Sequence, residues 1–156
     1  MYVPQDIHLF GGTIKQNILG IHKFIDDEWM LECSKMSGTD EFVRMHPAGY
    51  DMPLGERGAG LSGGQRQSVG IARALINNSD IWMFDEPTNA MDQTSESIVL
   101  NNLMSKIEGK TLLLVTQKMS MVDLVDRIIV MNFGTKVLDG PKDEIINKLG
   151  NSGEKQ

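Results

Sequence analysis

Residues 61–67 read LSGGQRQ, and residues 81–92 read IWMFDEPTNAMD. In the first stretch a serine and two glycines precede apolar residues at positions 69, 71, 72, 75 and 76. That spacing predicts a helix over residues 62–76 with the serine as its N-cap. In the second stretch a short apolar run, typical of a buried strand, ends in two consecutive acids.

The predicted helix start has the features of an anion site. Ser62 as N-cap leaves the next backbone N–H groups without helical acceptors, and Gly63 and Gly64 let another molecule approach the backbone closely. The positive end of the helix dipole adds to the attraction for a terminal phosphate. A Ser-Gly-Gly helix start is a weak signal alone. Followed by FDEPT at this spacing, it becomes a very specific one.

Asp85 and Glu86 are expected at the carboxyl end of a buried strand, where open α/β sheets bind ligands. Adjacent carboxylates repel each other unless a cation lies near them. A Mg²⁺ held by Asp85, directly or through water, with Glu86 polarising an attacking water, would account for both acids. The alternative is that they are two surface acids at a strand end.

The rest of the chain has a helical first half and an alternation of strands and helices after it. Fully apolar strands separated by helices imply an α/β fold, a parallel sheet covered on both faces. Residues 150–156 read as a polar tail. The helices are expected at residues 13–19, 26–36, 39–45, 93–107, 120–125 and 142–149, and the strands at 1–3, 80–84, 111–115, 127–131 and 136–140.

Composition excludes several classes of protein. The chain has 156 residues, the length of one domain, and a net charge of −6 with no run of basic residues, which argues against a nucleic-acid surface. Its apolar runs are a few residues long, whereas a membrane span needs about 20. No signal peptide opens the sequence. Cys33, the single cysteine, reads as a small helix residue in a reducing compartment.

The motifs together resemble the nucleotide-binding domain of ABC transporters. LSGGQ is similar to the family signature, IWMFDE to its Walker B strand, PTNAMD to its D-loop with Asp92, and YVPQD to its Q-loop with Gln5. LGERG at residues 54–58 resembles the loop that touches the transmembrane domain in exporters. The segments around these motifs look most like bacterial type I secretion and peptide exporters. The resemblance divides the chain into a Q-loop region (1–10), a helical signature subdomain (11–77), a RecA-like core (78–150) and a tail (151–156).

This resemblance implies an incomplete P-loop NTPase (RecA-like) fold with helices on both faces of a parallel sheet, plus the helical signature subdomain. It also implies ATP and Mg²⁺ as cofactors and a head-to-tail pair with a second ABC ATPase domain. The transmembrane domain would supply the only membrane association, at the cytoplasmic face of a bacterial inner membrane. The implied roles are catalysis for Glu86 and Gln117, nucleotide contact for Ser62, Gly63, Gly64, Gln65, Asp92 and Gln5, and metal binding for Asp85 and Gln5.

Two departures from the family pattern change the expected activity. The family's GxxxxGK[ST] loop is missing, since the lone GKT at residues 109–111 has Met104 where the earlier glycine belongs. The chain is therefore expected to be the C-terminal part of an ABC ATPase domain that does not bind Mg-ATP tightly alone. The expected sheet would then have an exposed apolar edge and marginal stability.

The second departure is Gln117, which stands where the family usually has a histidine that contacts the γ-phosphate. Glutamine can donate a hydrogen bond to a phosphate oxygen but cannot become cationic or relay a proton. Slower hydrolysis, a degenerate site and a tolerated replacement all remain open. So do two further classes: an inactive partner that supplies its signature to another subunit's ATP, and a soluble ABC protein of translation or DNA repair. The transported substrate, homodimer against heterodimer, and whether Met1 is the true start are left undecided by the sequence.

Overall fold

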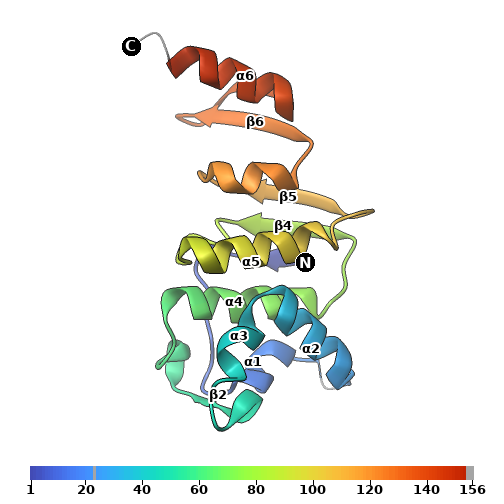
Figure 1. Cartoon of the computed structure of the whole chain (residues 1–156), viewed down its shortest axis with the longest axis vertical. Helices are drawn as coiled ribbons and strands as arrows, with labels where there is room; N and C mark the ends of the chain where they lie inside the picture. Colours follow the sequence, from blue (N-terminus) through green and yellow to red (C-terminus); the bar gives the residue numbers. More distant parts are fainter. Residues whose placement is uncertain (23, 154–156) are drawn as a thin grey trace. The chain divides into compact units, whose positions relative to one another are not determined.

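The structure, a computed structural model, describes residues 1–22 and 24–153 and divides into two compact units, Met1–Gln117 and Lys118–Gln156. Figure 1 colours the chain from the N-terminus in blue to the C-terminus in red and labels many of its helices and strands. Every motif quoted above lies in the first unit. The four-part division predicted from the sequence stays a prediction, and residues 154–156 of the expected tail lie outside the described residues.

A three-stranded parallel sheet forms the centre of the first unit. Its strands are β1 (Tyr2–Val3), β4 (Ile81–Asp85) and β5 (Thr111–Val115), in the order β1-β4-β5. In register, Val3 pairs with Phe84, and Phe84 pairs with Leu114. All three strands were predicted within one residue at each end. Because the strands are parallel, their carboxyl ends meet at one edge of the sheet, with Asp85 at the end of the middle strand.

The two faces of this sheet differ in burial. Val3, Trp82 and Phe84 are buried, and the Trp82 and Phe84 rings stack with their centroids 5.8 Å apart. The residues between them are exposed on the other face, which carries Tyr2, Ile81, Met83, Leu113 and Val115. The strands were expected to be covered on both faces. Within the described residues, only the face with Val3, Trp82 and Phe84 is covered. The described residues leave β1 and β5 paired with β4 alone, so the exposed edge expected from the sequence stays a prediction, and apolar side chains are also exposed on one face.

The described residues of the first unit form five α-helices, three of which begin with a side-chain cap. Thr13 and Ser62 begin their helices with complete capping boxes, and Asp92 caps the fifth helix through Ser95. The helices are α1 (Ile14–Leu19), α2 (Asp27–Met36), α3 (Thr39–Val43), α4 (Gly63–Leu75) and α5 (Gln93–Met104). Helix α4 packs against α1, α2, α3 and strand β1, so the signature helix is the main packing element of this unit.

Four short elements were not predicted from the sequence. Strands β2 (Gly12–Thr13) and β3 (Pro53–Leu54) pair antiparallel, and the turns η1 (Gly49–Asp51) and η2 (Glu56–Gly58) flank β3. Two-residue strands carry too few side chains to show an alternating pattern. Their pairing ties the loop before the signature to the start of α1.

A buried asparagine and a half-buried arginine join α1 to α4. The Arg73 guanidinium donates to the carbonyl oxygen of Asn17 at 2.7 Å and to its Oδ1 at 2.9 Å, and Asn17 is fully buried. Cys33 is buried in α2, and desolvation by burial raises the pKa of its thiol to about 12. The prediction that Cys33 is a structural helix residue agrees with this burial.

The second unit is a hairpin with a helix packed on it. Strands β6 (Arg127–Asn132) and β7 (Thr135–Pro141) pair antiparallel through a turn at Phe133 and Gly134, which both have positive φ. Two such residues are typical of the type I′ turn that suits the twist of a hairpin. The turn η3 (Met119–Leu124) precedes the hairpin, and α6 (Lys142–Gly153) follows it, with Ile145 fully buried. Helix α6 runs four residues beyond its predicted end.

Candidate functional site

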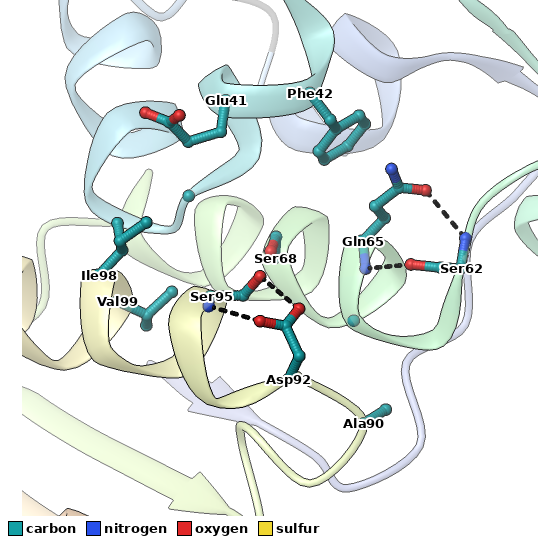
Figure 2. Close-up of a pocket in the computed structure, with 12 residues that line it drawn as sticks. Glu41, Phe42, Ser62, Gln65, Ser68, Ala90, Asp92, Ser95, Ile98 and Val99 are labelled. Atoms are coloured by element: carbon teal, nitrogen blue, oxygen red, sulfur yellow. Dashed lines mark hydrogen bonds between the residues drawn. The ribbon is translucent and has the colours of Figure 1, made fainter.

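The start of α4 is closed by a capping box between Ser62 and Gln65. The Ser62 N–H donates to Gln65 Oε1 at 2.9 Å, and the Gln65 N–H donates to Ser62 Oγ at 3.1 Å (Figure 2). This box uses the N–H of the third helical residue and leaves those of Gly63 and Gly64 without intrahelical acceptors. The predicted anion site is therefore a capped helix N-terminus with two backbone donors, and the Gln65 side chain acts first as part of the cap.

A pocket of about 320 Å³ lies beside this helix start. It brings residues of the signature together with the N-cap of α5, Asp92, as the sticks in Figure 2 show. Asp92 accepts hydrogen bonds from the Ser95 N–H at 2.9 Å and from the Ser95 hydroxyl at 2.7 Å, and these bonds lower the pKa of its carboxyl. Of the sequence-predicted site residues, the pocket is lined by Ser62, Gly64, Gln65 and Asp92.

The signature glycines are needed by this chain's own packing. A Cβ added to Gly63 would lie 3.0 Å from the Ala90 Cβ, and one added to Gly64 would lie 3.1 Å from the Ala90 carbonyl oxygen and 3.3 Å from the Met91 Cα. From the sequence, the space beside these glycines was expected to receive another molecule. The structure shows that part of it is taken by the loop that precedes α5.

The second group of predicted residues lies at the carboxyl edge of the sheet. Asp85 ends β4, Gln117 follows β5, and Gln5 follows β1, so parallel pairing brings the ends of three strands together. Glu86 is 8% exposed, and its Oε1 accepts a bond from the Gln117 N–H at 3.1 Å. The long contact from Thr116 Oγ1 to Glu86 Oε2 measures 3.4 Å.

Gln117 contacts Glu86 through its backbone N–H. Its backbone fixes one carboxylate oxygen of Glu86, a task that any residue with an N–H could perform. The Gln117 side chain is exposed and leaves that contact to the main chain. Replacing the family's usual histidine with glutamine is therefore compatible with holding Glu86 in place.

Gln67 is a buried residue of this region that was not predicted from the sequence. Its Nε2 donates to the Glu86 carbonyl oxygen at 3.3 Å, and its Oε1 accepts from the Ala90 N–H at 2.8 Å. The signal that could have revealed it is its helical position. Gln67 shares a face of α4 with the buried residues Ile71 and Ala74, so it is a polar residue on an apolar face.

The acids at the sheet edge suit a magnesium ion that is shared with phosphates. Mg²⁺ is usually held in proteins by one or two carboxylates together with phosphate oxygens and water, and Asp85 is a half-buried carboxylate at a strand end. Among residues 1–22 and 24–153, no group of three or more His, Cys, Asp and Glu side chains could form a metal site by itself. Asp85 therefore fits a magnesium site that is completed by a nucleotide.

Nothing in the part of the chain that the structure describes could cross a membrane as a helix. A parallel sheet with a capped helix start beside it and two acids at its carboxyl edge is typical of nucleotide-binding proteins. The model of the ABC transporter family matches residues 1–89. The chain belongs to the ABC transporter family and has the fold of its ATPase domain.

Similar proteins agree with this assignment. The chain is 40% identical over 144 residues to the leukotoxin translocation ATP-binding protein LktB of Mannheimia haemolytica. It is 39% identical to the leukotoxin export ATP-binding protein LtxB of Aggregatibacter actinomycetemcomitans. Each match covers 92% of this chain, and the chain spans about a fifth of the length of these relatives.

A solved structure of a bacterial Atm1-family ABC exporter with ATP bound is also similar. It matches with a TM-score of 0.88 and 31% identity, and the match covers 94% of this chain and 26% of that one. The resemblance to ABC exporters predicted from the motifs is therefore confirmed, as is the fold class. The roles of the individual site residues remain predictions.

Proposed function

We propose that this chain is the signature and Walker B part of an ABC exporter ATPase domain and that it acts in ATP hydrolysis coupled to export. The observation that carries the proposal is the separation of its chemistry into two groups of residues. Ser62, Gly64 and Asp92 line one pocket. Asp85 and Glu86 lie at the carboxyl edge of the sheet and do not line that pocket.

Because the signature residues and the acids at the sheet edge lie in different places, we expect each group to contact a different ATP molecule. The pocket at Ser62 offers backbone donors, and its Asp92 carboxylate is already bonded to Ser95 as the cap of α5. Glu86 lies outside that pocket and is the carboxylate proposed to activate water. In a head-to-tail pair, the signature of one domain faces the ATP bound by the other, and Glu86 serves the ATP bound by its own domain.

The proposed roles follow from the contacts. The N–H groups of Gly63 and Gly64, aided by the α4 dipole, bind the terminal phosphate of a partner's ATP. Glu86 accepts a proton from the attacking water, and the Gln117 N–H keeps one of its oxygens in place. Asp85 and Gln5 would hold a Mg²⁺ that neutralises charge on the phosphates. Gln65 braces the helix start through the capping box.

The wider assignment follows the relatives. Their names describe leukotoxin translocation and export, so a protein or peptide is the proposed cargo. The proposed partners are a second ABC ATPase domain and a transmembrane domain. Together they would hold this chain at the cytoplasmic face of a bacterial inner membrane.

The test is to complete the ATPase domain and remove the proposed base. The chain is joined to the P-loop segment of the Aggregatibacter leukotoxin exporter, and phosphate release from Mg-ATP is measured. Hydrolysis is expected in this hybrid, and Glu86→Gln should reduce kcat by about 10²- to 10⁴-fold while ATP binding persists. A hybrid that binds ATP and hydrolyses it equally well with Glu86→Gln would refute the role of Glu86.

A second candidate is an inactive partner that supplies its signature to another subunit's ATP. The exposed Gln117 side chain, which cannot relay a proton, favours it. It predicts that the hybrid does not hydrolyse ATP but stimulates an intact ABC ATPase in which the signature serine is mutated. Gln117→His separates the two candidates, because it should raise hydrolysis by the hybrid only if Glu86 and its surroundings are otherwise competent.

A further inference from the structure

Gln67 connects the signature helix to the loop after strand β4. It lies on α4 one turn beyond Gly63 and Gly64 and is 5% exposed. Its amide bonds both ends of a short segment, with Nε2 donating to the Glu86 carbonyl oxygen at 3.3 Å and Oε1 accepting from the Ala90 N–H at 2.8 Å. Both polar atoms of the side chain are thus committed to the backbone of one loop.

The loop bound by Gln67 begins with an unusual backbone conformation. Glu86 has a φ of 45°, in the left-handed region that is uncommon for residues other than glycine. Such a conformation persists only where the surrounding structure holds it in place. The Glu86 N–H donates to the Val115 carbonyl oxygen at 2.9 Å, and Gln67 binds its carbonyl oxygen. Gln67 therefore helps to set the direction in which the Glu86 side chain leaves the main chain.

The same loop is in close contact with the start of α4. Gly63 and Gly64 leave no room for a side chain between the helix and residues Ala90 and Met91. The loop is consequently packed against the helix start and hydrogen-bonded to it one turn later. A displacement of the helix start would therefore shift this loop and, with it, the backbone of Glu86.

We infer that Gln67 is a positioning residue that transmits phosphate binding at the signature to the orientation of Glu86. This inference rests on the proposed function, in which the signature contacts a partner's ATP and Glu86 activates water at the chain's own ATP. Gln67 then links the two ATP sites of a pair, together with the packing of Gly63 and Gly64 on the same loop. Gln67 touches neither nucleotide in this account and acts only through the backbone of residues 86–90.

The first test measures the contact in the 156-residue chain itself. Ala90 is an exposed residue whose N–H is nonetheless hydrogen-bonded, so its amide exchange reports on Gln67. Gln67→Leu should accelerate exchange at Ala90 by about 2- to 10-fold, the equivalent of one lost hydrogen bond. Gln67→Glu keeps an acceptor for Ala90 but loses the donor to Glu86, so it should leave Ala90 protected. Unchanged exchange in Gln67→Leu overturns the inference.

The second test measures kinetics in the hybrid domain described above. Gln67→Leu and Gln67→Glu should both reduce kcat by about 10- to 100-fold with little change in the KM for ATP, because both lose the bond to the Glu86 carbonyl. Asn102→Leu is the matched control. Its Nδ2 donates to the Lys35 carbonyl oxygen at 3.0 Å and joins α5 to α2 away from the loop, so it should lower the melting temperature without changing kcat.

The outcomes separate this inference from the proposed function. If kcat stays within twofold of wild type in Gln67→Leu while Ala90 exchanges faster, the contact is structural and the positioning role is wrong. If the unmodified hybrid neither hydrolyses ATP nor stimulates a partner, the proposed function fails, whereas the Ala90 exchange still decides whether Gln67 holds the loop. Equal losses of kcat in Gln67→Leu and Asn102→Leu would also overturn the positioning role.

Discussion

The signature side of the first unit and the open face of its sheet differ in how completely this chain covers them. On the signature side, the helix start is capped, the loop is packed against glycines, and Gln67 satisfies two backbone groups. Within the described residues, no buried side-chain nitrogen or oxygen lacks a hydrogen-bond partner. The open face instead exposes apolar side chains, with Tyr2, Leu113 and Val115 each more than half exposed.

This difference shows which part of the fold the chain completes with its own residues. The hydrogen bonds of the signature side join residues 62–95, so this chain supplies both partners of each one. The sheet belongs to a fold class in which helices cover both faces. We expect the open face to pack against further polypeptide of a complete ATPase domain, and contiguous exposed apolar surface is a common mark of such an interface.

The largest expected effect compares adjacent residues on the two faces of β4. Trp82 is 4% exposed, stacks on Phe84 and donates from its indole to the Ser79 carbonyl oxygen at 2.9 Å. Trp82→Ala should lower the free energy of unfolding by about 3–5 kcal/mol, the usual cost of removing a large buried ring. Met83 is 42% exposed, so Met83→Ala should change it by no more than about 0.5 kcal/mol.

Urea unfolding of both variants in the 156-residue chain provides the measurement. Similar losses from the two substitutions would show that the Met83 face is already covered in solution, for example by self-association. Repeating the measurement over a range of protein concentrations identifies that case, since only an associating chain becomes more stable as its concentration rises.

A smaller effect is expected where the helix start meets the loop. In Gly64→Ala the new Cβ would press against the Ala90 carbonyl and the Met91 Cα, which are backbone atoms and cannot rotate away. We expect a loss of about 1–2 kcal/mol in unfolding free energy, because overpacking outweighs the better helix propensity of alanine.

Gly11→Ala is the control for this prediction. Its Cβ would lie 4.0 Å from the nearest atom, the Leu54 carbonyl oxygen, so its effect should stay within about 0.5 kcal/mol. If Gly64→Ala were as stable as Gly11→Ala, the loop would be free to move away from the signature helix. The close contact between the two would then be weaker than the distances indicate.

Sequence reasoning predicted the elements better than the contacts between them. Strand β5 and the N-cap of α4 were placed correctly because apolar runs and caps are local signals. Gln67 was missed, since its partners at Glu86 and Ala90 are 19 and 23 residues away and no local pattern links them. Alternating burial in β4 was also missed, because an entirely apolar strand gives no sign of which face is covered.

The functional roles were predicted from the motifs. The structure agrees with the grouping of some of these residues and changes the expected surroundings of others. Ser62 and Asp92 were both expected to contact nucleotide, and they line one pocket. The space beside Gly63 and Gly64 was expected to receive another molecule, yet the chain's own loop occupies part of it. Motif spacing carries the chemistry of a site, but it contains no information on which backbone segments pack against each other.

The smallest expected effect concerns the cap of α5 at the edge of the pocket. The two bonds from Ser95 lower the pKa of Asp92 in the folded chain. Because the folded pKa lies below the unfolded value of about 3.9, the stability that the ionised carboxylate contributes is present above that value. It is lost as the pH falls through the folded pKa. Ser95→Ala removes the hydroxyl donor but keeps the backbone donor, so the pKa of Asp92 should rise part of the way to its usual value.

An NMR titration of the Asp92 carboxyl measures its pKa in the wild type and in the variant. Ser97→Ala is a suitable control, because the Ser97 hydroxyl donates to the Gln93 carbonyl instead. An Asp92 pKa that does not change in Ser95→Ala would mean that the cap seen beside the signature pocket is not held in solution, and the signature side would then be less complete than the contacts indicate.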